Sequence, residues 1–76
     1  MENYLNCKKV DTAINRARKM LIAKAKKNGL YENFGQEEVI KIKEKFIDIT
    51  DYSPEMNSIR NKVDRFDNWC MEYTGH

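Results

Sequence analysis

The stretch from Asn3 to Asn28, NYLNCKKVDTAINRARKMLIAKAKKN, decides the fold of this 76-residue chain. It contains no proline or glycine, and its apolar side chains recur every three or four residues, the spacing of one helix face. The members of this stripe are Cys7, Val10, Ile14, Ala17, Leu21 and Ala25. We therefore expect one long helix over this stretch. The alternative is a shorter helix capped by Asp11 and Thr12, with residues 1–10 as a separate arm.

A second segment with helical periodicity covers residues 36–48. It places Val39, Ile42 and Phe46 on one face, with acidic residues in its first turn and lysines later, which suits the helix dipole. A strand is the competing interpretation, because isoleucines alternate along part of the segment. The adjacent apolar residues at 46 and 47 break that alternation and favour a helix.

A third helix is expected over residues 54–73. Ser53 is suited to cap its first turn, and Pro54 fits the first helical position, where its missing N–H costs nothing. The apolar stripe of this segment consists of Met56, Ile59, Val63, Phe66, Cys70 and Tyr73, with Trp69 beside it. The three segments predict an all-α fold, a small three-helix bundle with a long basic N-terminal helix, as a single domain over residues 1–76.

The loop GLYENFG, residues 29–35, is rich in apolar side chains for a connection. We expect Leu30, Tyr31 and Phe34 to fold back onto the core. Cys7 and Cys70 are predicted to be two reduced thiols on apolar helix faces, as is usual in a cytosolic protein, and a disulfide that ties the two ends of the chain together is the alternative.

Charge is divided unevenly along the chain, although the formal total is only +2. Residues 1–29 carry eight basic against two acidic side chains, a net of +6, and residues 30–76 carry six against ten, a net of −4. On a helical wheel with Ile14 at zero, six cations fall between about 120° and 220°, opposite the apolar stripe. Arg18 and Lys24 flank the stripe instead. Such an asymmetry is typical of proteins that meet polyanions or charged protein partners.

Several function classes have little support in the sequence. The only histidine is His76, and no set of ligands at zinc spacing, glycine-rich phosphate loop or nucleophile–base pattern is present. No apolar run approaches the roughly 20 residues of a membrane span. We therefore expect a cytoplasmic protein that is not an enzyme, holds no metal or cofactor and does not enter a membrane.

The basic side of the first helix favours RNA binding without sequence specificity. RNA is preferred over duplex DNA because the connections are too long for a helix-turn-helix. Tyr4, Tyr31 and Phe34 are candidates for stacking on bases. The alternatives are docking onto an acidic protein, pairing with the acidic part of a second copy in a homo-oligomer, and a merely solvated face. The predicted nucleic-acid-binding residues are Lys8, Lys9, Arg16, Arg18, Lys19, Lys26 and Lys27.

Two segments resemble small accessory proteins of T4-type bacteriophages. They are AKAKKNGLYENFGQEEV, residues 23–39, and FDNWC, residues 66–70, the latter followed by Tyr73, Thr74 and Gly75. One member of that group is an RNA-binding antagonist of a type III toxin–antitoxin ribonuclease. The resemblance implies a counter-defence protein in the host cytoplasm, a toxin inhibitor that acts through RNA and through protein–protein interaction. It supplies no site residues.

Overall fold

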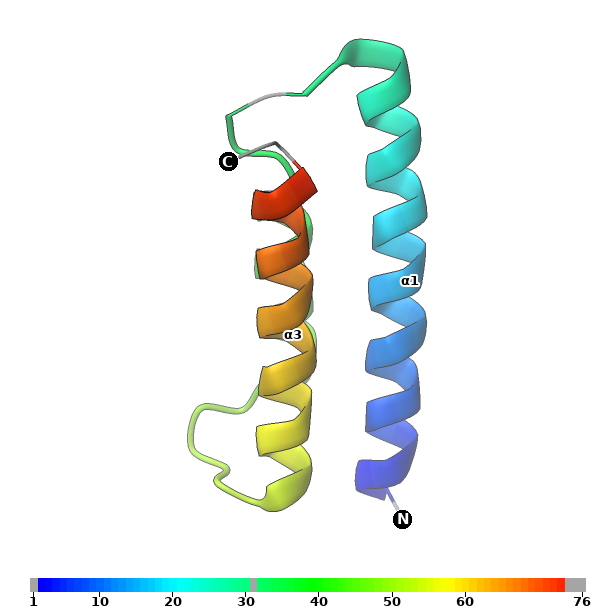
Figure 1. Ribbon diagram of the computed structural model, residues 1–76. Helices are drawn as coiled ribbons and strands as arrows, with labels where there is room; N and C mark the ends of the chain where they lie inside the picture. Colours follow the sequence, from blue (N-terminus) through cyan, green and yellow to red (C-terminus); the bar gives the residue numbers. More distant parts are fainter. Residues whose placement is uncertain (1, 31, 74–76) are drawn as a thin grey trace.

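Three helices build the part of the chain that the computed structural model describes, which is residues 2–30 and 32–73 with side chains from residue 7 onward. They are α1 (Glu2–Asn28), α2 (Gln36–Phe46) and α3 (Pro54–Tyr73), and each contacts the other two. In Figure 1, α1 and α3 lie side by side and run in the same direction, while α2 returns behind α3. Within the described ranges there is no strand, so the prediction of an all-α three-helix bundle is confirmed.

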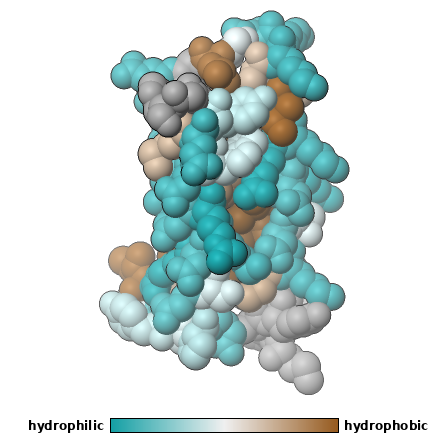
Figure 2. All heavy atoms as spheres, viewed as in Figure 1, coloured by the Kyte–Doolittle hydropathy of each residue, from teal (hydrophilic) through white to brown (hydrophobic). Residues whose placement is uncertain are grey.

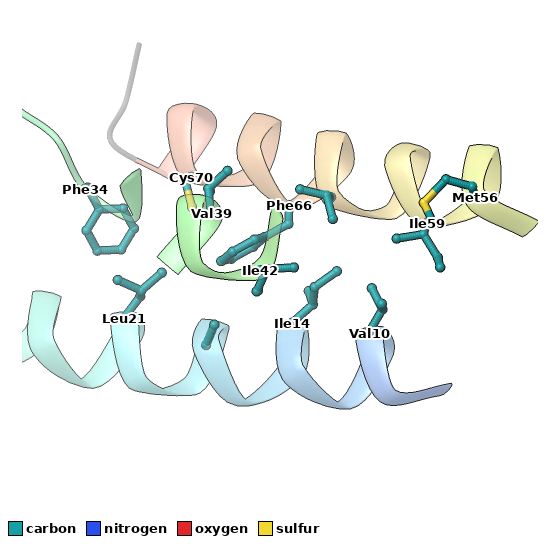
Figure 3. Packing of buried hydrophobic residues seen from close by; sticks show 12 residues of the cluster. Val10, Ile14, Leu21, Phe34, Val39, Ile42, Met56, Ile59, Phe66 and Cys70 are labelled. Atoms are coloured by element: carbon teal, nitrogen blue, oxygen red, sulfur yellow. The ribbon is translucent and has the colours of Figure 1, made fainter. Parts of the chain in front are cut away.

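The core lies along the line where α1 faces α3, with α2 closing it from behind (Figure 3). Val10 and Leu21 of α1 and Val63 and Phe66 of α3 have no exposed surface. Phe66 lies at the centre of this layer, next to Ile42 of α2. The stripes expected from the sequence therefore point inward except at Tyr73, which is 37% exposed. Burial of apolar surface is the main term that stabilises so small a bundle.

The ends of the helices are set by the residues at and next to them. α1 is continuous through Asp11, so the alternative with a separate arm is wrong. At the start of α3 the Oγ of Ser53 accepts a hydrogen bond from the backbone N–H of Met56 at 3.2 Å, as its capping role requires. α2 ends at Phe46, two residues before the expected end, because Ile47 has an extended backbone with φ −100° and ψ 123°.

The loop between α1 and α2 is anchored by Phe34, which is 3% exposed. Its ring lies 5.4 Å from that of Tyr73 and 6.3 Å from that of Trp69, measured between centroids. Leu30, however, is 49% exposed, so the expectation that it folds back is wrong. It follows directly after Gly29, which has a φ of 80° and turns the chain away from the core. Tyr31 is outside the described residues.

Gly35 lies at the N-terminal end of α2, with a φ of 80°. A Cβ at this position would collide with the Sγ atom of Cys70. The position therefore needs glycine both for its left-handed backbone and for the close approach of α3. Cys70 and Cys7 are both free thiols, as predicted. None of the described helices combines the length and the apolar character that crossing a membrane requires.

Candidate nucleic-acid interface

Six basic side chains lie on the side of α1 that faces away from the core. We call this set the basic face. It consists of Lys8, Lys9, Arg16, Lys19, Lys26 and Lys27, and all six are exposed. At the helical rise per residue they extend over about 28 Å of the helix axis. In Figure 2 the outer edge of α1 is covered largely by hydrophilic atoms. The face is therefore long enough to meet several phosphates of one nucleic-acid strand.

Three of these cations have no polar partner among the described residues. Arg16, Lys19 and Lys26 make no hydrogen bond or ion pair with any residue that the structure describes. By contrast, Lys62 of α3 donates to Asp11 of α1, with 2.9 Å between Nζ and Oδ1. An acidic residue of α1 is thus paired across the bundle and does not neutralise Arg16, Lys19 or Lys26.

Arg18 is separated from the other predicted site residues. Its guanidinium carbon lies 5.5 Å from the centroid of the Trp69 ring, in the groove between α1 and α3. Its Nε atom is buried and has no hydrogen-bond partner. A polar hollow of about 150 Å³ beside it is also lined by Lys62 and Arg65. Arg18 therefore belongs to the helix–helix contact, and six of the seven predicted binding residues share one face.

The other groove, between α1 and α2, adds a cation that the sequence did not single out. A hollow of about 320 Å³ brings residues of α1 together with Lys45 and Phe46 at the end of α2. The Lys45 Nζ atom lies 5.3 Å from the centroid of the Phe46 ring. The α1 residues that line this hollow are Lys8, Lys9, Thr12, Ala13 and Arg16. Lys45 thus extends the basic face across the groove.

A second hollow of about 290 Å³ continues the same groove and has a different lining. It shares Ala13 and Arg16 with the first hollow. Its remaining walls come from both helices and are Ala17, Met20, Glu38, Lys41 and Ile42. Met20 is 41% exposed, so apolar surface is open to solvent here. The burial of Glu38, which is 7% exposed, was not expected for a residue in the first turn of α2.

None of the three aromatic residues proposed for base stacking is seen exposed beside the basic face. Phe34 is buried among Trp69 and Tyr73 and cannot reach a base, so this expectation is wrong. The side chain of Tyr4 and all of Tyr31 lie outside the described part of the chain. Among the described residues no group of three or more histidine, cysteine or acidic side chains is arranged to hold a metal ion.

The fold and this surface define a small helical bundle with one strongly cationic side. No protein-family model, curated protein or solved structure is similar enough to this chain to count as a match. The functional interpretation therefore depends on the geometry and charge of the bundle itself.

Proposed function

We propose that this protein binds RNA through the basic face of α1. The observation that carries the proposal is the concentration of six exposed cations on one side of a single rigid helix. Like charges three or four residues apart destabilise a helix by a few tenths of a kcal/mol per pair. A surface selected only for folding would mix acidic residues among them. A polyanion that neutralises these charges offsets the repulsion.

The contacts that this face offers are to the phosphate backbone and not to base edges. Lysine ammonium groups act as point charges, and the guanidinium of Arg16 can donate two hydrogen bonds to one phosphate. Binding through about six phosphates of single-stranded RNA predicts a slope of about −4 for log K against log salt concentration. Such binding is largely independent of sequence.

The decisive variant reverses Arg16, Lys19 and Lys26 to Glu. All three side chains are exposed, so the variant should keep its helical circular dichroism and lose RNA binding in a fluorescence anisotropy titration. The matched control reverses three exposed cations elsewhere, Lys24, Lys43 and Arg65, which produces the same change in net charge. Binding by the control should fall far less. Equal losses in the two variants would mean that net charge alone matters.

Unchanged RNA binding in the triple variant would reject the proposal. Absence of RNA binding by the native protein would favour the other candidate, docking of the basic face onto an acidic host protein. Light scattering at low and high salt separates both from self-association, because a homo-oligomer held by charge dissociates as salt rises.

We extend the proposal to the counter-defence role that the sequence resemblance implies. A protein that covers RNA phosphates denies that RNA to ribonucleases. The expected result is slower cleavage of a bound RNA by a purified ribonuclease, and no protection by the variant with Arg16, Lys19 and Lys26 reversed to Glu.

A further inference from the structure

The groove between α1 and α2 has two ends with different linings, one without an acidic residue and one with more apolar side chains. The two hollows that form it meet at Ala13 and Arg16, which line both. Small side chains at positions 13 and 17 hold the groove open, because an alanine projects only one carbon from the helix. The groove thus presents two adjoining compartments beside the basic face.

The first compartment is suited to a phosphate. Lys9 and Arg16 of α1 face Lys45 of α2 across it, and none of the residues that line it is acidic. The hydroxyl of Thr12 adds an uncharged donor. Cations converging from two helices onto one hollow differ from a row of lysines on a convex surface, because they surround a ligand atom on more than one side.

The second compartment is suited to an uncharged, flat group. Ala17 and Ile42 are buried at its base, and the thioether of Met20 is partly exposed at its rim. Glu38 and Lys41 also line it, and the carboxylate makes this compartment less favourable for a phosphate than the first, which has no acidic residue. A carboxylate accepts hydrogen bonds from N–H groups such as those of a nucleobase. The orientation of a ligand in the groove follows from this difference between the compartments.

Size limits the ligand as well. Each hollow lies near the lower end of the range of small-molecule pockets, about 300 Å³. From Lys9 to Met20 the groove follows about 16 Å of the α1 axis. These dimensions suit a nucleotide and exclude a base pair, which could not enter either compartment with its partner attached.

We propose that this groove holds one unpaired nucleotide of a single-stranded RNA, with its phosphate between Lys9, Arg16 and Lys45 and its base against Met20 and Ile42. The inference rests on the proposed RNA binding and adds the substrate class. A base must leave its stack to enter the groove, so single strands bind better than duplexes. If the protein contacted phosphates alone, it would bind a duplex more tightly than a single strand, because a duplex carries the denser charge.

The first test fills the groove without changing any charge. Ala13→Leu places a larger side chain where the two compartments meet, and Asn61→Leu is the control at an exposed position of α3 that lines neither compartment. The probe is a labelled oligouridine, compared with an RNA duplex of the same strand length. Ala13→Leu should weaken oligouridine binding about fivefold, because roughly 40 Å² of apolar contact with the base at about 25 cal/mol per Å² is lost, and should leave duplex binding unchanged. Circular dichroism verifies that both variants are folded.

The second test removes one cation of the groove. Lys45→Gln should make the slope of log K against log salt shallower by about 0.7, the loss of one phosphate contact on a single strand. Lys43→Gln is the control, because Lys43 is also an exposed lysine near the end of α2 but lines neither compartment. The control should keep the native slope. This measurement remains informative if Ala13→Leu fails to fold.

The outcomes separate this inference from the proposed function. If the reversal of Arg16, Lys19 and Lys26 abolishes binding while Ala13→Leu and Asn61→Leu bind oligouridine alike, the protein binds RNA without using the groove. A native protein that prefers the duplex also overturns the inference. If the native protein binds neither probe, the proposed function itself fails.

Discussion

The inner and outer faces of α1 belong to the same helix but differ in burial and in charge. On the inner face Val10 and Leu21 are fully buried against α2 and α3. On the outer face the six cations of the basic face lie in solvent. Side-chain truncation on the inner face removes buried apolar contacts, whereas on the outer face it removes charge alone. Variants on the two faces should therefore separate stability from binding.

The largest expected effect is loss of the core that the inner face packs against. Phe66 is fully buried, and Phe66→Ala should cost about 3–5 kcal/mol of unfolding free energy. A bundle of this size has about that much stability in total, so the variant should be unfolded or nearly so. Circular dichroism during urea titration measures the change. Ile49→Ala is the control, since Ile49 is 78% exposed, and it should shift stability by less than about 0.5 kcal/mol. A cooperative, native-like transition in Phe66→Ala would contradict the description of the core.

The thiol of Cys70 should be protected by the same core. Burial, together with the nearby carboxylates of Asp67 and Glu38, raises the pKa of Cys70 from its usual value near 9.0 to about 11. At pH 8 the reactive thiolate of Cys70 is then about a hundredfold rarer than at an unperturbed cysteine. In a Cys7→Ser variant, the remaining thiol should react slowly with a disulfide reagent in the folded protein and rapidly in urea.

The raised pKa also predicts the direction of a pH effect. Between pH 9 and 11 the unfolded chain has lost the Cys70 proton while the folded protein retains it, so stability falls as pH rises. Cys70→Ala lacks this contribution and serves as the reference for other groups that titrate in the same range. Identical pH profiles of the two proteins above pH 9 would show that the Cys70 thiol is not perturbed.

Arg60 provides a cation with a structural role to compare with those of the basic face. Its Nη2 atom donates to the backbone oxygens of Asp48 at 2.9 Å and Asp51 at 3.0 Å, and its guanidinium lies 5.5 Å from the Tyr52 ring centroid. Arg60→Ala should therefore destabilise the protein by about 1–2 kcal/mol. Arg16→Ala should cost less than about 0.5 kcal/mol. Thermal unfolding of the two variants measures the difference, and equal losses would show that the basic face also has a structural role.

The sequence was sufficient for those features that depend on local periodicity. The stripes of α1 and α3, the Ser53 cap and the outward position of six cations all follow from residues a few positions apart. The early end of α2 was missed because Asp48 makes its own local structure, in which its Oδ1 accepts hydrogen bonds from the backbone N–H and the hydroxyl of Thr50. Such a turn competes with helix for an aspartate whose sequence context is otherwise helical.

The groove between α1 and α2 could not be predicted from the sequence. Lys45 lies beside Arg16 only because the two helices pack in one particular register, which is set by contacts across the whole core. The position of Arg18 has the same origin, since the wheel placed it near the apolar stripe but did not place Trp69 opposite it. Partners from distant segments are decided by packing, and no pattern within one segment encodes them.

The smallest expected effect has opposite signs for stability and for binding. Ala23 is exposed on the outer side of α1, and a glutamate there has Lys19 four residues before it, Lys26 three after it and Lys27 four after it. Ala23→Glu should therefore raise the free energy of unfolding by about 0.3–1 kcal/mol through these pairs. The same carboxylate repels phosphate, so RNA affinity should fall. Ala23→Gln controls for size, and only the glutamate should change both the free energy of unfolding and the RNA affinity.

A stabilised Ala23→Glu variant with native RNA affinity would show that the cations around position 23 are a solvated surface. If a phosphate backbone contacts these cations, neutralising them must weaken the binding of RNA.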